Sequence, residues 1–291
     1  MSSFRAGDSG KHRISCLDSE DKSPRMKVAV VQLGLHPTNP DKAVKSAETQ
    51  IRSAAGAGAR LVCLPEHWLL SQVLSSRDPI LLRFGNLARE LGIYLNLGAN
   101  YEKRGSKVYL TSQTFSPDGS LVSRQDKLYL YRSERRRAVP GSRFNLVDVD
   151  GFRVAVLVCH DVVFPETART VTLMGAELLV VPSLIIAAGL DPWLVYLRAR
   201  SLENRVPLVS ANAYWPPRFL GRSVILDLNY SEKEHVMKLA EEWTQPGRTF
   251  VLADLDLRRN VHQRAERLRE LRDSGAFPKL MKSATRRTDR R

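Results

Sequence analysis

The sequence contains no apolar stretch that approaches the roughly 20 residues needed for a membrane-spanning helix. We therefore expect a soluble protein without a membrane partner. Residues 1–25 are polar, carry charges of both signs and lack an apolar core, so they match neither a signal peptide nor a good transit peptide. We interpret them as a disordered tail, or as the product of an upstream start codon chosen in place of Met26.

Cysteine and histidine are also scarce. Three cysteines without a Cys-x-x-Cys pair do not make a disulfide framework, and this favours reduced, cytoplasmic surroundings. Cys16 lies in the N-terminal tail, and Cys63 lies in an apolar run where a small buried residue is expected. The 6 histidines include no helical pair at metal-binding spacing, so we predict no metal. Gly56-Ala-Gly58 lacks the third glycine of a dinucleotide-binding loop and predicts a helix-ending turn.

Positive charge is in excess, with 45 Lys and Arg against 31 Asp and Glu. The last 34 residues alone hold 12 Lys or Arg against 4 Asp or Glu. Such an end could bind nucleic acid or an anionic surface. No DNA- or RNA-binding motif accompanies it, so we favour a solvated basic tail over residues 274–291 and expect no nucleic-acid partner.

Between Met26 and Arg272 the sequence alternates strand and helix patterns, which is typical of an α/β protein built from packed layers. We see no internal repeat and no linker. Turn signals stand at Ser116-Pro-Asp-Gly119 and at Asp150-Gly151. The expected strands are 27–33, 60–64, 93–101, 108–115, 121–130, 144–149, 152–158, 177–181, 206–211, 224–228 and 249–255, and the expected helices are 41–55, 79–91, 167–174, 192–204 and 257–271.

Three residues that can carry chemistry stand at or near the ends of expected strands. Cys159 closes an apolar run, and a helix opens shortly after it, which is where a thiolate is most readily stabilised. Glu66 ends another strand and Lys127 lies near the end of a third. Each has an ordinary interpretation, as a buried core cysteine, a first-turn acid and an edge-strand lysine. Taken singly, the ordinary interpretations are preferred.

Together these residues lie in motifs that resemble those of the nitrilase superfamily of carbon–nitrogen hydrolases. The resemblance covers about Met26 to Arg272, and the family's second glutamate is matched by Glu134. The motifs, in order, are Leu64-Pro-Glu66-His-Trp, Asp126-Lys127-Leu-Tyr-Leu, Val158-Cys159-His-Asp-Val-Val-Phe-Pro-Glu166, and Arg198-Ala-Arg-Ser-Leu-Glu203-Asn-Arg205 followed by Val209-Ser-Ala-Asn212.

The resemblance implies a four-layer α-β-β-α sandwich over residues 26–273 that pairs into a homodimer or larger assembly through the helices beside the cysteine motif. It implies Cys159 as nucleophile and Glu66 as proton carrier. Lys127, with the backbone N–H that follows Cys159, would stabilise the oxyanion, and Glu134 would position the lysine and the substrate. No external cofactor is implied.

Several positions depart from the family pattern. His160 replaces the usual aromatic residue after the cysteine, Tyr129 stands where a histidine is frequent, and the late Asp-Pro-x-Gly turn is replaced from Asp227 onward. Because adjacent residues leaving a strand point to opposite sides, we interpret His160 as a pocket or packing residue rather than a base. Asp161 is interpreted as a turn or capping group.

The substrate is less clearly indicated. Nitrile-cleaving members usually carry Trp-Glu after the cysteine, and its absence favours amide or carbamoyl substrates. Ser183 and Leu184 lie at a strand end that should border the pocket. A carboxylate at the entrance could be met by Arg135, Arg136 and Arg137, although a solvated basic loop is their ordinary interpretation. We therefore expect an amidohydrolase of a small linear amide. The alternatives are an N-carbamoyl amine or amino-acid hydrolase, a nitrilase, and a non-catalytic binding protein on the same fold.

Overall fold

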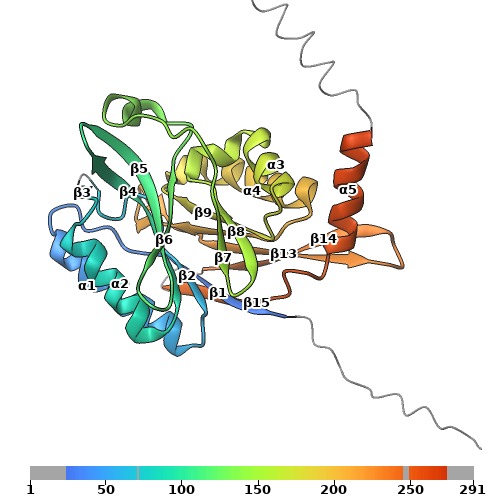
Figure 1. The fold of residues 1–291 in the computed structure, drawn as a ribbon, viewed down its shortest axis with the longest axis horizontal. Helices are drawn as coiled ribbons and strands as arrows, with labels where there is room; N and C mark the ends of the chain where they lie inside the picture. The colour runs from blue at the N-terminus through green and yellow to red at the C-terminus, as the bar shows by residue number, and fades with distance from the viewer. Residues whose placement is uncertain (1–23, 71, 245–248, 274–291) are drawn as a thin grey trace, which may run out of the picture.

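The computed structural model describes residues 24–70, 72–244 and 249–273. Expectations for Cys16, for most of the N-terminal tail and for residues 274–291 lie outside these ranges. In the described part of the chain, strands form two large sheets (Figure 1). The first sheet has the order β15-β1-β2-β4-β5-β6, with β3 beside β4, and the second has the order β14-β13-β10-β9-β8-β7.

Most elements lie within a few residues of their expected ranges, but the strands Val73–Ser75, Tyr214–Trp215, Phe219–Leu220 and Val236–Trp243 were not predicted. The first sheet contains β1 (Met26–Val31), β2 (Leu61–Cys63), β3 (Val73–Ser75), β4 (Tyr94–Arg104), β5 (Lys107–Phe115), β6 (Leu121–Asp126) and β15 (Phe250–Leu255). The second contains β7 (Leu146–Val149), β8 (Phe152–Val156), β9 (Leu178–Ser183), β10 (Leu208–Asn212), β13 (Val224–Ser231) and β14 (Val236–Trp243), and a small ribbon joins β11 (Tyr214–Trp215) to β12 (Phe219–Leu220). The helices are α1 (Pro40–Gly56), α2 (Pro79–Leu91), α3 (Pro165–Leu173), α4 (Leu190–Asn204) and α5 (Val261–Asp273).

The sheets and helices form the expected four-layer α-β-β-α sandwich. Helices α1 and α2 lie outside the first sheet, and α3 and α4 lie outside the second (Figure 1). Strand β1 shows how the sequence sets the layers, because Val28 and Val30 join the core between the sheets, whereas Ala29 and Val31 pack with Ile51 of α1. Alternate residues of a strand face opposite sides, so this apolar strand serves two cores.

Helix ends follow their sequence signals. Asn39 accepts a hydrogen bond from the Lys42 N–H at the start of α1, and Asp78 accepts one from the Ile80 N–H at the start of α2. Helix α2 ends at Gly92, which has a φ of 63°. The predicted turn at Gly56-Ala-Gly58 and the Asp150-Gly151 hairpin between β7 and β8 are both confirmed.

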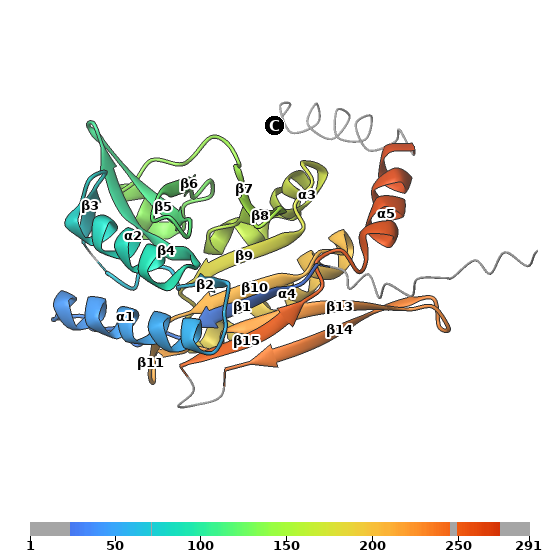
Figure 2. The ribbon, with the colours of Figure 1, turned by 60° about the horizontal axis from the view of Figure 1, so that its bottom comes forward.

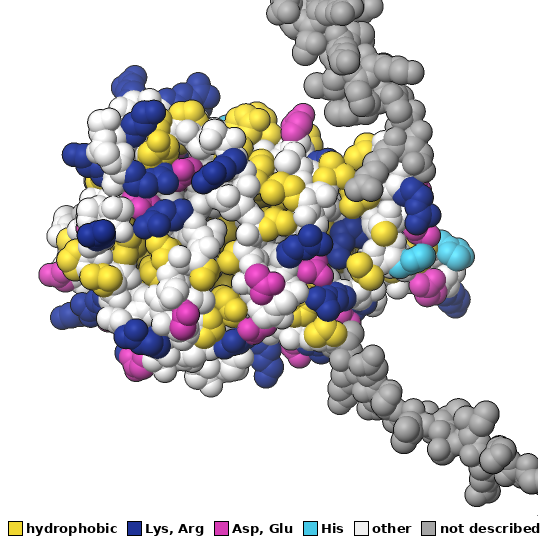
Figure 3. Space-filling view, in the orientation of Figure 1, with side chains coloured by type: hydrophobic (Ala, Val, Ile, Leu, Met, Phe, Trp, Pro, Cys, Tyr) yellow, Lys and Arg dark blue, Asp and Glu magenta, His cyan; other side chains and the backbone are white. Residues whose placement is uncertain are grey.

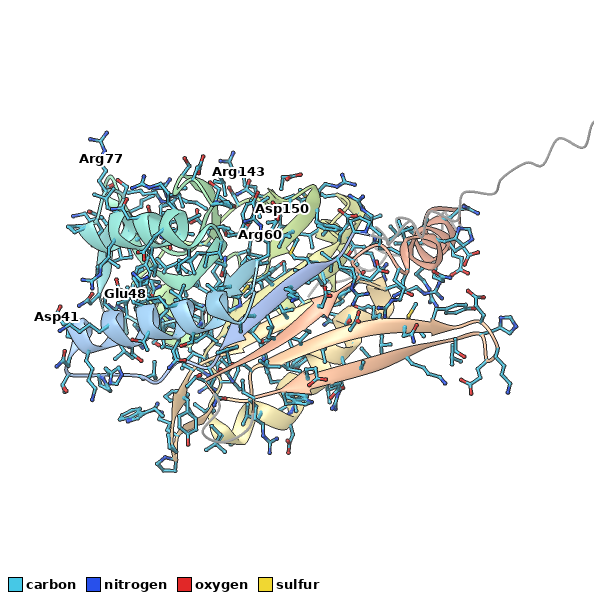
Figure 4. The ribbon with its side chains drawn as sticks, turned by 90° about the horizontal axis from the view of Figure 1, so that it is seen from below. Asp41, Glu48, Arg60, Arg77, Arg143 and Asp150 are labelled. Atoms are coloured by element: carbon cyan, nitrogen blue, oxygen red, sulfur yellow. The ribbon has the colours of Figure 1, made fainter. Side chains whose placement is uncertain are left out.

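One ion pair links the start of β2 to the β7–β8 turn and so joins the two sheets. The Arg60 Nε lies 2.5 Å from Asp150 Oδ2, and the Arg60 guanidinium also donates to the Gly92 carbonyl. Figure 4 shows Arg60 and Asp150 beside each other at the edge of the sandwich. Since both side chains are about 40% exposed, the pair contributes about 1 kcal/mol or less.

Three expectations need correction. Strand β6 ends at Asp126 rather than at residue 130. The Lys127 N–H still donates to Leu110 of β5, but the Leu128 and Tyr129 N–H groups donate to Asp161 instead of to a strand. Strand β14 was not predicted, since its charged residues hide the alternation of exposed and half-buried positions. It forms a long hairpin with β13 that extends toward α5 (Figure 2). Helix α5 begins at Val261, not at residue 257, and Leu257 is buried ahead of it.

Within the described ranges, no helix has both the length and the apolar character required to cross a bilayer.

Candidate active site

Glu66 is held by a bulge in the neighbouring strand. The register between β4 and β5 shifts between Asn96 and Ala99, and Gly98 in this bulge has a φ of 66°. A Cβ at Gly98 would lie 1.8 Å from the Pro65 carbonyl oxygen, so the loop that carries Glu66 can approach only a glycine here. The Glu66 N–H donates to the Ser183 carbonyl at 3.3 Å, and Glu66 is 1% exposed.

Lys127 follows directly after β6 and is also 1% exposed, so it is not an edge-strand lysine. Its backbone N–H donates to Leu110 and its carbonyl accepts from Gly141, each at 2.8 Å. The ammonium Nζ lies 2.8 Å from Glu66 Oε1 and 2.9 Å from Glu134 Oε1. The structure therefore places one buried ammonium between two carboxylates that are far apart in the sequence.

Cys159 begins a single 3₁₀ turn (Cys159–Val163) after β8, and α3 starts only at Pro165. The φ of Cys159 is 44°, a left-handed value that bulky residues rarely adopt. The turn is fixed by Asp161, whose Oδ2 accepts the Val158 N–H at 3.1 Å. Cys159 is 7% exposed, and the Leu184 N–H hydrogen-bonds its sulfur.

The charges around Lys127 favour its protonated form. Burial by itself lowers the pKa of Lys127, but the charges of Glu66, Cys159 and Glu134 raise it above its ordinary value. A buried ammonium paired with two carboxylates stays charged, because removing its proton would leave those carboxylates without compensation.

The Cys159 thiol differs from the expectation of a readily formed thiolate. Burial raises the pKa of the thiol well above 9, and the charge of Glu66 raises it further. Lys127 and the Leu184 N–H act in the opposite direction without cancelling the increase. The short 3₁₀ turn brings too little helix dipole to reverse this, so the resting cysteine is a thiol beside a carboxylate.

Glu134 lies in the 3₁₀ turn Arg132–Arg136 and is contacted by a residue that the sequence did not single out, His67. Burial raises the pKa of Glu134, but hydrogen bonds from His67 and Lys127 outweigh it and hold the value at about 2. An ionised carboxylate only accepts hydrogen bonds, so the His67 Nε2, 3.3 Å from Glu134 Oε1, must carry the proton. His67 has a φ of 54°, a backbone turn that no sequence signal predicted.

The structure gives different surroundings to the three residues that were predicted to bind substrate. Ser183 is fully buried, and its hydroxyl bonds to Ser210 and Ala211 on the next strand, so it is a structural group in this conformation. Leu184 borders the cysteine through its N–H. His160 packs edge-on against Tyr131 and Phe164, with ring centroids 5.0 and 5.3 Å apart, in agreement with the interpretation as a packing or pocket residue.

The structure also shows the surroundings of Arg135 and Glu166. The Arg135 Nε donates to the Leu130 carbonyl, and Arg135 lines a small cavity of about 310 Å³ with His160 and Tyr129. Glu166 is an exposed acid in the first turn of α3.

A possible cation site can be tested against the same geometry. Ligand atoms of Glu66, His67 and Glu134 lie within 4.8 Å of one another. The Lys127 ammonium already contacts both carboxylates, and His67 uses its Nε2 proton on Glu134. The carboxylates and the His67 Nε2 of this cluster are therefore already engaged in contacts within the protein.

The fold and the site together place the chain in a structural class, namely α-β-β-α sandwiches that carry a buried candidate nucleophilic cysteine beside a carboxylate and an ammonium group. A family model described as carbon-nitrogen hydrolase matches residues 27–253. The chain thus belongs to the carbon–nitrogen hydrolase family, within the nitrilase superfamily.

Relatives and solved structures agree with this assignment. A nitrilase of Pyrococcus abyssi is 30% identical over 233 residues, which cover 75% of this chain and 86% of that protein. The omega-amidase NIT2-A of Xenopus laevis is 29% identical over 208 residues, or 65% and 74% of the two chains. A mutant amidase of Nesterenkonia sp. AN1 has a TM-score of 0.67 at 24% identity, with 86% and 97% covered, and shows the shared fold.

Proposed function

We propose that this protein is a cysteine-dependent hydrolase of non-peptide C–N bonds, which acts on a small linear amide and releases ammonia through a thioester intermediate. One observation carries the proposal. The buried Lys127 ammonium contacts Glu66 at 2.8 Å and Glu134 at 2.9 Å, and the charges of Glu66 and Lys127 act on the Cys159 thiol. A proton acceptor, an anion stabiliser and a nucleophile are thereby within one water-poor cluster.

In the acylation step, Glu66 accepts the thiol proton as the Cys159 sulfur bonds to the amide carbon. The raised pKa of the thiol means that proton removal accompanies attack rather than preceding it. The carbonyl oxygen becomes an oxyanion, which Lys127 and the N–H after Cys159 stabilise. One such donor is typically worth about 3 to 4 kcal/mol. Collapse of the intermediate breaks the C–N bond, and protonated Glu66 delivers its proton to the departing ammonia.

In the deacylation step, Glu66 takes a proton from water while the water oxygen attacks the thioester carbon. The C–S bond then breaks, the carboxylic acid product leaves, and the proton returns to the thiolate. Glu134 does not exchange protons in this scheme. It fixes the Lys127 ammonium, and the low pKa of about 2 keeps it ionised for that task.

An amide substrate is supported by the omega-amidase relatives and by the shared fold of an amidase. That Nesterenkonia amidase carries the acetamide moiety of fluoroacetamide added covalently at its active-site cysteine. The similarity to a nitrilase favours nitriles as the second substrate class.

We also propose that two copies pair through the outer face of α3 and α4. Apolar side chains on these helices and at the C-terminal cap of α3 are exposed, among them Leu173 at 41%, Met174 at 42% and Val195 at 62%. Light scattering should give at least twice the 32.8 kDa chain mass, and Val195→Asp should lower it.

The test is an ammonia-release screen of the full chain over small amides, ω-amides, N-carbamoyl compounds and nitriles. We expect turnover of amides, and Cys159→Ala should abolish it while Cys63→Ala, which changes a buried core cysteine, should leave it largely intact. Carbon dioxide released with ammonia would indicate a carbamoyl substrate instead, and conversion of a nitrile would indicate a nitrilase. Full turnover by Cys159→Ala would overturn the proposed mechanism.

A further inference from the structure

A cavity lies at the edge of the first sheet, apart from the cysteine. It has a volume of about 780 Å³ and is bounded by β5, β6 and the segment 139–146. None of Glu66, Lys127, Glu134 and Cys159 lines it. Its volume lies in the range of about 300–1,000 Å³ that is typical of small-molecule sites.

Four basic side chains line this cavity, and each comes from a different segment. They are Arg104 at the end of β4, Lys107 at the start of β5, Arg124 in β6, and Arg143 ahead of β7. Figure 3 shows Lys and Arg side chains gathered over the part of the surface where Figure 1 places β4 and β5. The cavity therefore draws together cations that are up to 39 positions apart in the sequence.

Nearby carboxylates compensate only part of this charge. Arg104 pairs with Asp126 at 2.5 Å, and Arg124 pairs with the buried Glu102 at 3.0 Å. Asp126 also accepts the Thr111 hydroxyl at 2.7 Å on the same oxygen. Among the described residues neither Lys107 nor Arg143 forms an ion pair, so the cavity keeps two uncompensated cations.

The lining is suited to an anion with several oxygen atoms. The Arg104 guanidinium lies 4.0 Å from the centroid of the Tyr109 ring, and this stacking holds its planar fork at the cavity wall. Guanidinium groups bind phosphate oxygens through paired N–H donors, and a lysine adds a compact charge. A concave lining of this size fits a small molecule better than the long, open track that nucleic acid requires.

From this lining we propose that the cavity is a binding site for a small phosphate-bearing anion, distinct from the amide site. Lys107 and Arg143 supply the uncompensated charge. The N–H groups of Arg104 and Arg124 that are not used on Asp126, Glu102 and the Ser76 carbonyl supply further donors. The proposal does not depend on the chemistry at Cys159.

The experiment is a calorimetric titration of the full chain with inorganic pyrophosphate, an anion whose two phosphate groups offer oxygens to more than one cation of the lining. We expect saturable binding at one site per chain. The double variant Lys107→Ala with Arg143→Ala should bind at least about tenfold more weakly. A matched control, Lys45→Ala with Arg269→Ala, removes one exposed lysine and one exposed arginine elsewhere and should bind within about twofold of the wild type. All three proteins keep residues 274–291, so any contribution of that segment cancels.

Three outcomes would overturn the proposal. Absence of saturable binding to the wild-type chain would remove the site. An equal loss in the control variant would show that net charge, not the cavity, attracts the anion. A single-stranded oligonucleotide that binds more tightly than pyrophosphate and loses its affinity in the same double variant would identify the surface as a nucleic-acid site instead.

Discussion

The Tyr129 N–H donates to the Asp161 carboxylate at 2.8 Å, and this bond joins the segment after Lys127 to the turn after Cys159. The Leu128 N–H donates to the same oxygen, and the Val158 N–H donates to the other. One fully buried carboxylate thus holds two segments that carry proposed catalytic groups. Asp161 acts on the site through the backbone and touches neither functional side chain.

Replacement of Asp161 should damage stability and turnover together. Asp161→Ala leaves three N–H groups without their acceptor, of which the Val158 N–H is buried and the other two are partly buried, at a cost of about 1–3 kcal/mol for each buried group that finds no other partner. We expect a lower urea midpoint and a large loss of amide turnover. Asp148→Ala is the control, since Asp148 accepts one exposed N–H in the β7–β8 turn. Wild-type stability and turnover in Asp161→Ala would contradict the proposed link.

The stability of the wild type should depend on pH through Asp161. Burial raises the pKa of Asp161 to about 7, although three N–H groups favour its ionised form. The pKa of Asp161 in the folded state therefore lies above its value in the unfolded state. The contribution of Asp161 to the free energy of unfolding is full below about pH 4 and is lost as the pH rises through 7.

Asp161→Asn does not titrate and serves as the reference. The free energy of unfolding of the wild type should exceed that of the variant most at pH 5, and the difference should narrow by at most about 1.4 kcal/mol per pH unit up to pH 7. Urea titrations at pH 5, 6, 7 and 8 measure this. A difference that stays constant or widens with pH would show that Asp161 is ionised throughout.

Gly98 should be irreplaceable by alanine. A Cβ there would meet the Pro65 carbonyl at 1.8 Å and displace the loop that carries Glu66. We expect Gly98→Ala to fold with reduced stability and to lose most of its turnover. Gly105→Ala is the matched control, because Gly105 has a similar φ of 60° and open space at the Cβ position. If Gly98→Ala and Gly105→Ala lose turnover equally, the loss comes from backbone strain at a positive φ and not from the contact of the new Cβ with Pro65.

Substitutions of Glu66 and Glu134 should lower turnover for different reasons. Glu66→Gln removes the proposed proton carrier at nearly constant shape, and single acid–base groups are typically worth about 10² to 10⁴-fold in rate. Glu134→Gln should impair turnover through Lys127 yet leave the Cys159 thiol able to react with a small alkylating reagent. Steady-state ammonia release and mass spectrometry of a Cys159 thioester distinguish the two. Normal turnover by Glu66→Gln would require another base, with Glu134 the first candidate and His160 the second.

Much of the fold could be predicted from apolar runs that end in turn residues. The sequence placed Glu66 and Cys159 after strands because each follows a continuous apolar stretch, and the structure agrees. It could not place the end of β6, since that end is set by Asp161, a residue 32 positions beyond Tyr129 in the sequence. Long-range acceptors of this kind leave no local pattern.

The part of the site that the sequence did not predict also depends on long-range contacts. Glu66 and Lys127 were predicted from motifs, but the contact of His67 with Glu134 depends on a left-handed φ at His67. A positive φ at a non-glycine residue is uncommon, and here the surrounding structure rather than a local sequence signal holds it. The raised pKa of the thiol likewise depends on burial between two sheets, which strand patterns do not quantify.

Glu66 and Lys127 follow strands of the first sheet, whereas Cys159 follows a strand of the second. Neither half of the sandwich therefore contains all of the proposed reacting groups, even if it forms all of its own hydrogen bonds. During refolding from denaturant, ellipticity reports each sheet as it forms, but catalysis must wait until the two sheets dock face to face. The recovery of turnover therefore reports when the two sheets dock, and it should lag behind the recovery of secondary structure.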